Sequence, residues 1–186
     1  MREDKRQLRQ RLRQNPRPGD DHRLCRHVLG HPWFHQAKTV MAYAAMPGEA
    51  NLGQVLRETL EQGKRLVLPR CEPDGTMTAR LISDLKELVP GTMGISEPQE
   101  DAPKVMPEEI DLVLVPGMAF DPLGGRLGRG KGYYDRFLAE YPGKSVGICY
   151  HGNLLEAVPM EGHDKTMDAV VTDQTIIQCE RRARHV

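Results

Sequence analysis

The sequence lacks a net charge, because its 26 Lys and Arg residues balance its 26 Asp and Glu residues. A chain without net charge has no global field that attracts nucleic acid or an anionic membrane, so any anion binding must be local. Aromatic residues make up only 5% of the chain and are not interleaved with basic ones, which argues against an RNA-binding surface. We therefore expect neither nucleic acid nor membrane as a partner.

The sequence also lacks paired cysteines and long apolar runs. Cys25, Cys71, Cys149 and Cys179 lie far apart, and none forms the C-x-x-C pair typical of zinc or redox sites. No run approaches the roughly 18 apolar residues that a membrane span needs. The N-terminus is charged from its second residue, unlike a secretory signal. We expect reduced thiols in a soluble, cytoplasmic protein.

The length of 186 residues suits one substantial domain and is too short for two, so we expect residues 1–186 to form a single domain. Residues 1–14 are rich in strong helix formers, with Leu8 and Leu12 on one face, which predicts a basic N-terminal helix. The basic tail at residues 181–186 is expected to fray.

Short apolar runs rich in β-branched residues alternate with amphipathic helical patterns. The runs predict buried strands over 39–46, 65–70, 110–120, 145–150 and 169–177, and the helical patterns cover 21–30, 51–63 and 133–141. Asn51 is placed to cap the second of these helices and Gly63 to end it. The alternation predicts a Rossmann-like, three-layer α/β/α fold with a mostly parallel central sheet. Residues 72–109, rich in Pro, Gly and acids, are expected to cross the surface irregularly.

A glycine-rich stretch, GGRLGRGKGYYD at residues 124–135, follows the predicted strand 110–120 and leads into a predicted helix. Free backbone N–H groups and the positive end of the helix dipole converge at such a junction. Arg126, Arg129 and Lys131 add full charges, which suit a triphosphate better than a single carboxylate. The stretch predicts an anion site. The alternative, a solvated surface turn, fits its place between strand and helix poorly.

Two familiar phosphate-binding motifs do not account for this loop. GRLGRGKG follows the P-loop pattern up to Gly132, which replaces the Ser or Thr that would hold magnesium. The dinucleotide fingerprint G-x-G-x-x-G fails because Tyr133 stands where its third glycine should be. Both motifs are excluded.

A nucleotide site without a hydroxyl ligand in its loop needs carboxylates from elsewhere, because Mg²⁺ takes hard oxygen ligands. Asp135 lies within one helical turn of the glycines. Asp164, in EGHDKTMD, precedes a predicted strand; the alternative for this residue is a helix cap or a solvated loop acid.

The stretch VPGMAFDPLGGRLGRGKGYYDRFL, residues 115–138, resembles the signature of the 5-formyltetrahydrofolate cyclo-ligase family, also called methenyltetrahydrofolate synthetases. Lys5 and Arg9 in KRQLR occupy the places of the family's basic ATP contacts. MPGEANL, with Glu49, resembles the family's substrate-binding segment, LPR its second-strand motif, and HDKTMD the motif that carries its second metal aspartate. The likeness covers most of the chain and is weak between about residues 72 and 108.

Two departures from the family's pattern concern the folate side of the site. Asn153 stands where family members often carry glutamine, and we assign it no role. Ala50 and Asn51 replace the more usual apolar-acid or apolar-Thr pair after Glu49. Neither departure removes a charge that the chemistry needs.

The resemblance implies an ATP- and Mg²⁺-dependent ring closure that converts 5-formyltetrahydrofolate into 5,10-methenyltetrahydrofolate, ADP and phosphate. It gives the catalytic role to Arg129 and Lys131 and metal binding to Asp135 and Asp164. The implied ATP contacts are Lys5, Arg9, Arg126, Leu127, Gly128, Arg129, Gly130, Lys131, Gly132, Tyr133 and Tyr134. The implied folate contacts are Glu49, Arg129, Gly130, Lys131, Gly132 and Tyr133.

ATP and 5-formyltetrahydrofolate are thus the expected partners of a monomer. From the residues alone, a solvated basic face would be the favoured interpretation of Lys5 and Arg9, and Glu49 could be a surface acid. Another ATP-dependent small-molecule ligase or kinase, and a non-catalytic nucleotide- or RNA-binding module, are the alternative functions.

Overall fold

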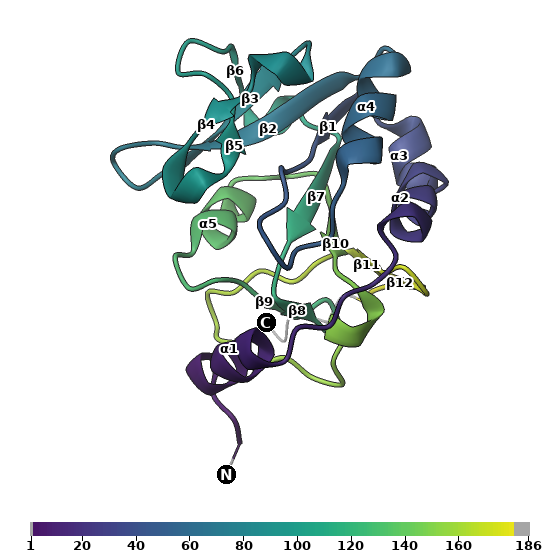
Figure 1. Cartoon of the computed structure of the whole chain (residues 1–186), viewed down its shortest axis with the longest axis vertical. Coiled ribbons are helices and arrows are strands. Elements are labelled where there is room, and N and C mark those ends of the chain that lie inside the picture. The colour runs from purple at the N-terminus through teal and green to yellow at the C-terminus, as the bar shows by residue number, and fades with distance from the viewer. Residues whose placement is uncertain (1, 181–186) are drawn as a thin grey trace.

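The computed structural model describes residues 2–180, so the tail expected to fray at 181–186 lies outside the described residues. The main sheet contains β1 (Thr39–Met41), β2 (Arg65–Cys71), β3 (Met77–Ile82), β6 (Lys104–Val105), β7 (Leu112–Pro116), β10 (Lys144–Ile148), β11 (Ala169–Val171) and β12 (Ile176–Gln178). Its order is β12-β11-β10-β7-β1-β2-β3-β6 (Figure 1). The strands from β11 to β2 in this order run parallel, and β12, β3 and β6 pair antiparallel. The mostly parallel sheet is therefore confirmed.

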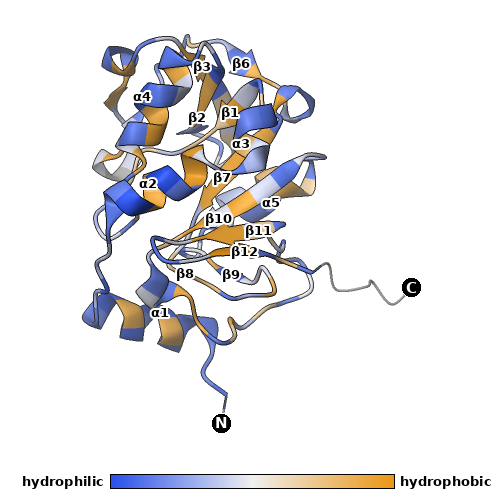
Figure 2. Ribbon diagram, turned by 90° about the vertical axis from the view of Figure 1, so that its right-hand side faces the viewer, coloured by the Kyte–Doolittle hydropathy of each residue, from blue (hydrophilic) through white to orange (hydrophobic). Residues whose placement is uncertain are grey.

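Helices cover both faces of the sheet, though unequally (Figures 1 and 2). α2 (Asp21–Leu29), α3 (Pro32–Gln36) and α4 (Gly53–Glu61) pack on one face, and α5 (Tyr133–Ala139) packs on the other. In β7, Leu112 and Leu114 join the core under α2 to α4, whereas Val113 and Val115 join the core under α5. Successive side chains of a strand point to opposite faces, so a continuous apolar run serves both cores.

Helix α1 (Lys5–Gln14) stands at one end of the molecule, apart from the sheet (Figure 1). The Asp4 side chain accepts the N–H of Gln7, and the Gln7 side chain accepts the N–H of Asp4, which forms a capping box. Leu8 and Leu12 are buried and pack in a cluster with Ala119, Leu127 and Val158. Ala119 and Leu127 belong to a hairpin of β8 (Ala119–Phe120) and β9 (Arg126–Leu127). The predicted leucine face thus docks α1 on the base of the glycine-rich loop.

The expectation that residues 72–109 lack regular structure is wrong. β2 turns at Gly75, which has φ 84°, into β3, with Leu66 opposite Ile82. A hairpin of β4 (Val89–Pro90) and β5 (Ser96–Glu97) and the edge strand β6 follow. The signals were present in the sequence: apolar and polar residues alternate over 77–81, and Asp-Gly is a frequent hairpin turn. The high content of Pro and acids obscured them.

The predicted strand 169–177 is a hairpin in the structure. The Thr172 hydroxyl accepts the N–H groups of Gln174 and Thr175, and the chain reverses between β11 and β12. A threonine hydroxyl that bonds nearby backbone in this way stabilises a turn. The apolar periodicity alone could not reveal that turn.

Several element boundaries also differ from the prediction. α4 begins at Gly53 with Leu52 at its N-cap, although Asn51 Oδ1 accepts the Gly53 N–H at 2.8 Å. Gly63, with φ 73°, follows the helix end as predicted. α5 ends at Ala139, before residue 141. The run at 39–46 gives β1, which ends at residue 41, and the run at 110–120 gives two strands, β7 and β8, separated at residues 117–118. The remaining short helical turns are η1 (Leu85–Glu87), η2 (Thr92–Gly94), η3 (Pro107–Glu109) and η4 (His151–Asn153).

Across residues 2–180, no helix combines the length and the hydropathy that crossing a bilayer requires. Each of the four cysteines is a free thiol, as expected, and three of them are buried.

Candidate active site

A cavity of about 890 Å³ opens beyond the carboxyl ends of three neighbouring parallel strands. Tyr43 follows β1, Cys71 ends β2 and Gly117 follows β7, and all three line the cavity. Loops at this edge of an open α/β sheet form the usual ligand site of such folds. The cavity therefore lies where the sequence predicts the anion site.

The glycine-rich loop forms one wall of the cavity, through residues 128–132. Gly124 has φ 84°, and a Cβ there would lie 2.4 Å from the carbonyl oxygen of Met167. Gly132, with φ 71°, is the N-cap of α5. A residue with a side chain would be strained at both positions. The bare backbone thus lets the loop pass close to the chain before β11 and turn sharply into α5.

Arg126 is the most internal of the three loop cations. Its Nε donates to the Pro116 carbonyl at 2.8 Å, and its guanidinium lies 5.2 Å from the centre of the Tyr134 ring. Burial lowers the pKa of Arg126, and the nearby Asp135 carboxylate opposes that shift. An arginine stays protonated even so, so a fixed positive charge lies at the base of the loop.

Glu49 faces the loop from the segment after β1. Its side chain is 9% exposed, and its Oε1 lies 3.8 Å from Arg129 Nη2 and accepts the Met46 N–H at 3.0 Å. Burial raises the pKa of the Glu49 carboxyl, whereas Arg129 and the Met46 N–H lower it. The predicted folate acid and the predicted catalytic arginine thus meet in one cavity.

Helix α1 presents Lys5 and Arg9 to the same cavity. The Arg9 Nε donates to the Gly128 carbonyl at 2.8 Å, and Lys5 Nζ forms an ion pair with Asp164. The Asp164 carboxyl is 5% exposed and accepts the Glu161 N–H at 2.7 Å. Burial raises the pKa of Asp164, but Lys5 and the Glu161 N–H together outweigh it and hold the pKa below its usual value.

The two predicted metal ligands line the same cavity. The Asp135 Oδ1 accepts the N–H of Lys165, the residue after Asp164, at 3.3 Å. This contact brings the loop with Asp164 against the first turn of α5. Glu161 and His163 also offer ligand atoms within 4.8 Å of each other and of an Asp164 oxygen. The His163 side chain is 72% exposed.

The two tyrosines after the loop, Tyr133 and Tyr134, differ in how far they reach into the core. Tyr133 lines the cavity, with the Arg136 guanidinium 5.3 Å from its ring centre. Tyr134 lines it too but also packs against the core under α5, and burial raises the pKa of its hydroxyl. Leu127 departs from the expected ATP contacts, because its side chain is buried in the α1 cluster and does not line the cavity. It supports the loop from behind.

Sequence reasoning missed the wall formed by β2, β3 and the β4–β5 hairpin. Cys71, Met77, Ile95 and Glu97 line the cavity from these elements. The turn signals after residue 71 could have placed these side chains near β2, because adjacent segments joined by tight turns pair in space.

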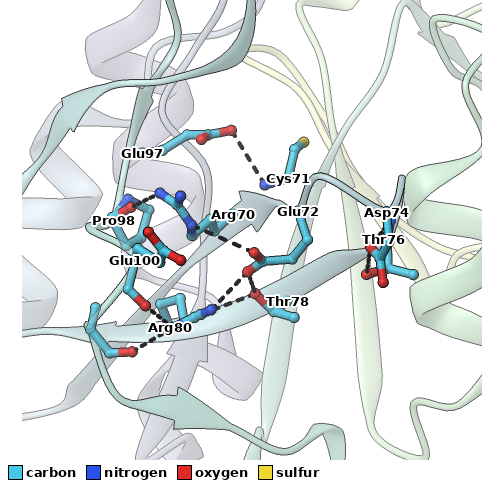
Figure 3. Close-up of polar contacts among 11 residues, drawn as sticks. Arg70, Cys71, Glu72, Asp74, Thr76, Thr78, Arg80, Glu97, Pro98 and Glu100 are labelled. Atoms are coloured by element: carbon cyan, nitrogen blue, oxygen red, sulfur yellow. Dashed lines mark hydrogen bonds and ion pairs between the residues drawn. The ribbon is translucent and has the colours of Figure 1, made fainter.

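A polar network fixes this wall to the sheet (Figure 3). The buried Arg80 donates to the Glu72 carboxylate at 2.7 Å and to the carbonyls of Glu100 and Ala102 at 2.6 and 2.8 Å. Arg70 donates to the Pro98 carbonyl at 2.9 Å. The two arginines thus tie residues 98–102 to the β2–β3 hairpin, and with them Glu97.

The fold and this cavity define an α/β domain in which a cationic glycine loop, a basic helix and buried carboxylates surround one ligand site. A model of the 5-formyltetrahydrofolate cyclo-ligase family matches residues 1–173. The chain belongs to this family, and the resemblance noted in its sequence is confirmed.

The chain aligns with known members of the family over most of their length. The probable 5-formyltetrahydrofolate cyclo-ligase of Schizosaccharomyces pombe is 31% identical over 172 residues, which cover 83% of this chain and 84% of the relative. The 5-formyltetrahydrofolate cyclo-ligase of Escherichia coli K12 is 32% identical over 155 residues, which cover 80% of this chain and 85% of the relative. The solution structure of Aquifex aeolicus 5,10-methenyltetrahydrofolate synthetase matches with a TM-score of 0.83 at 30% identity, over 98% of this chain and 99% of that one.

Proposed function

We propose that this chain catalyses the ATP-dependent cyclisation of 5-formyltetrahydrofolate to 5,10-methenyltetrahydrofolate, with release of ADP and phosphate. Family membership gives the reaction class. The observation that carries the proposal is the single cavity in which the cationic loop, the basic face of α1, two aspartates and the buried Glu49 converge. These groups match the two halves of the reaction, a polyphosphate and an N–H-rich heterocycle.

The chemistry explains the positive charge of the loop. A formamide is a poor electrophile because its nitrogen donates into the carbonyl, and its oxygen is a poor leaving group. Transfer of the γ-phosphoryl group to the formyl oxygen gives an imidate phosphate. The N10 amine of the folate then attacks the formyl carbon, and phosphate leaves. Catalysis of the first step consists mainly of positioning and of neutralising charge on the phosphoryl group.

The loop and α1 hold the nucleotide in this proposal. Arg129 and Lys131 neutralise the transferring phosphoryl group, and the backbone amides of residues 128–132 cradle the phosphates. Arg126 adds its fixed charge, with Tyr134 beneath it. Lys5 and Arg9 close over the nucleotide, which the contact of Arg9 with Gly128 supports.

The oxygen atoms of Asp135 and Asp164 fit Mg²⁺, which prefers carboxylate and water ligands. When bound, Mg²⁺ supplies further neutralisation of the phosphate charge. Asp164 is paired with Lys5 in this structure. We propose that Lys5 leaves Asp164 and turns to the nucleotide when the two substrates bind.

Glu49 and Tyr133 hold the folate in this proposal. Glu49 accepts hydrogen bonds from N–H groups of the pterin ring, and the Tyr133 ring packs on the folate near the reacting atoms. We propose that the active unit is a monomer; sedimentation of the protein with both substrates tests that state.

A single assay tests the function. The protein is mixed with ATP, Mg²⁺ and 5-formyltetrahydrofolate, and the methenyl chromophore is followed over time. We expect chromophore and ADP in equal amounts. Folded protein that binds ATP but yields no chromophore would instead be another ATP-dependent ligase or kinase. RNA binding with a steep salt dependence and no ATP turnover would indicate a binding module.

A further inference from the structure

Glu97, the last residue of β5, is a buried carboxylate that the proposed roles above leave without a function. It is 5% exposed and lines the cavity. Its Oε1 accepts the Cys71 N–H at a long 3.3 Å (Figure 3). Among residues 2–180, no charged nitrogen of a Lys, Arg or His side chain lies within 4 Å of its carboxylate oxygens.

This arrangement is costly for the free protein. A buried carboxylate is normally paired with a cation or satisfied by several good donors. Glu97 has only weak ones among the described residues, the long Cys71 N–H contact and the Cys71 thiol. Its second oxygen rests against Gly91, where a Cβ would lie 2.2 Å from Oε2. Gly91 has φ −111°, so its backbone does not require glycine. The missing side chain at position 91 makes room for the carboxylate.

Glu97 stands near the reacting end of the cavity. The Cys71 thiol lies among Glu97, Tyr133 and Lys131: burial raises the pKa of the thiol, Glu97 raises it further, and Lys131 and Tyr133 lower it. Lys131 and Tyr133 are the residues to which the proposed function gives the phosphoryl group and the reacting part of the folate. Glu49 also lines the cavity, but it lies against Arg129.

We propose that Glu97 is the proton acceptor for ring closure, a role that rests on the proposed function. N10 of 5-formyltetrahydrofolate carries one hydrogen, and N10 of the methenyl product carries none. As the N10 lone pair forms the bond to the formyl carbon, the N10 proton passes to the Glu97 carboxylate. The carbon–oxygen bond to phosphate then breaks, phosphate leaves with the electron pair, and Glu97 returns the proton to water.

The test separates the two chemical steps in a single turnover. Glu97→Gln keeps the size of the side chain and an oxygen for the Cys71 N–H, but it cannot take a proton. Rapid quench with bound ATP and 5-formyltetrahydrofolate should give ADP at nearly the wild-type rate. Methenyl formation should slow by roughly a hundredfold or more, the range for a lost general base. Glu100→Gln, an exposed glutamate of the same segment, should change neither rate.

A second variant perturbs the same carboxylate without changing it. Gly91→Ala places a methyl group against Oε2 and should also delay methenyl formation relative to ADP. The inference is overturned if Glu97→Gln closes the ring as fast as wild type. It is also overturned if both steps slow equally alongside a lowered Tm, because that pattern marks a structural residue. A wild-type protein that forms no methenyl product would contradict the proposed function itself and not this role alone.

Discussion

Lys131 is exposed, whereas Arg126 and Arg129 are half-buried. Its backbone carbonyl accepts Arg136 Nη1 at 2.9 Å, a contact that an alanine retains. Lys131→Ala should therefore keep the loop but lower kcat by roughly a hundred- to a thousandfold, the usual loss for such a transition-state contact. Steady-state kinetics measures this, with Lys86→Ala, an exposed lysine outside the cavity, as control. Nearly normal turnover would remove Lys131 from the mechanism.

Glu49, the proposed folate contact, illustrates how a buried carboxylate can lower the stability of the folded protein. Because burial raises its pKa, its stabilising contribution is complete below the unfolded pKa of about 4.3 and is lost as pH rises through the folded value. Glu49→Gln should thus raise Tm at pH 7, and the gain should vanish below about pH 4. The same variant should bind 5-formyltetrahydrofolate more weakly.

Thermal melts across this pH range, with calorimetry of folate binding, check both parts of the Glu49 prediction. Glu61 is an exposed glutamate at the end of α4. The control variant Glu61→Gln should change neither the Tm nor the affinity for folate. A Glu49→Gln protein with lower Tm at pH 7 would show that its bonds to Arg129 and Met46 outweigh the cost of burial.

Asp135 is one of the two residues that we propose to bind Mg²⁺, and a single substitution there tests this role. Asp135→Asn keeps an oxygen for the Lys165 N–H but removes the charge that attracts Mg²⁺. We expect activity at low Mg²⁺ to fall and the metal concentration for half-maximal rate to rise. A magnesium titration of turnover measures this, beside Asp101→Asn, an exposed acid outside this cavity. An unchanged titration would argue against coordination by Asp135.

At the scale of elements, α1 is held to the protein chiefly by its leucine face. Leu8→Ala should remove about 2 to 5 kcal/mol of packing, part of which will appear as undocking of the helix. Because α1 carries Lys5 and Arg9, the KM for ATP should rise by roughly tenfold as the docked population falls. Leu24→Ala, equally buried but on α2, should lower Tm without this change in KM.

Two measurements distinguish the leucine variants. Turnover at varied ATP concentration gives the KM, and hydrogen exchange of the backbone amides of residues 5–14 reports whether α1 is docked. If exchange in α1 stays slow while the KM is unchanged, the helix is docked by contacts other than Leu8.

The β4–β5 hairpin shows the same dependence of site on element, because Arg80 fixes residues 98–102 and thereby positions Glu97.

For the whole molecule, Asp173 joins three distant parts of the chain. Its carboxylate accepts the N–H groups of Asp20 at 3.0 Å and His151 at 2.7 Å. Burial raises the pKa of Asp173, but these N–H groups outweigh it and lower the pKa. The stability that it contributes is therefore present above the unfolded pKa of about 3.9 and is lost as pH falls through the lower folded value.

Asp173→Asn should cost about 1 to 3 kcal/mol at pH 7 through poorer pairing of buried donors. As pH falls below about 4, the Tm of the Asp173→Asn protein should also fall less steeply than the Tm of wild type. Melting curves between pH 3 and pH 7 test this, and Asp101→Asn provides an exposed aspartate for comparison. Parallel curves for wild type and Asp173→Asn would show that Asp173 does not contribute to acid unfolding.

The sequence by itself determined the parallel core and the glycine-rich loop between strand and helix, because both depend on local order along the chain. Buried β-branched runs, the leucine spacing of α1 and the glycines of residues 124–132 each encode their structure within a few residues. The same local reading explains the errors. The high content of Pro and acids over residues 72–109 obscured the alternation of β3, and apolar periodicity alone does not show the turn at Thr172.

Only the tertiary structure decided which side chains meet. Lys5 and Asp164 are 159 residues apart in sequence, and Glu97 reaches the cavity only because β3 returns antiparallel beside β2. Leu127 shows the reverse, since a residue inside the signature faces the core. Strand order and helix docking fix such distances, and these arise from burial of the whole apolar surface, which no single segment of the sequence specifies.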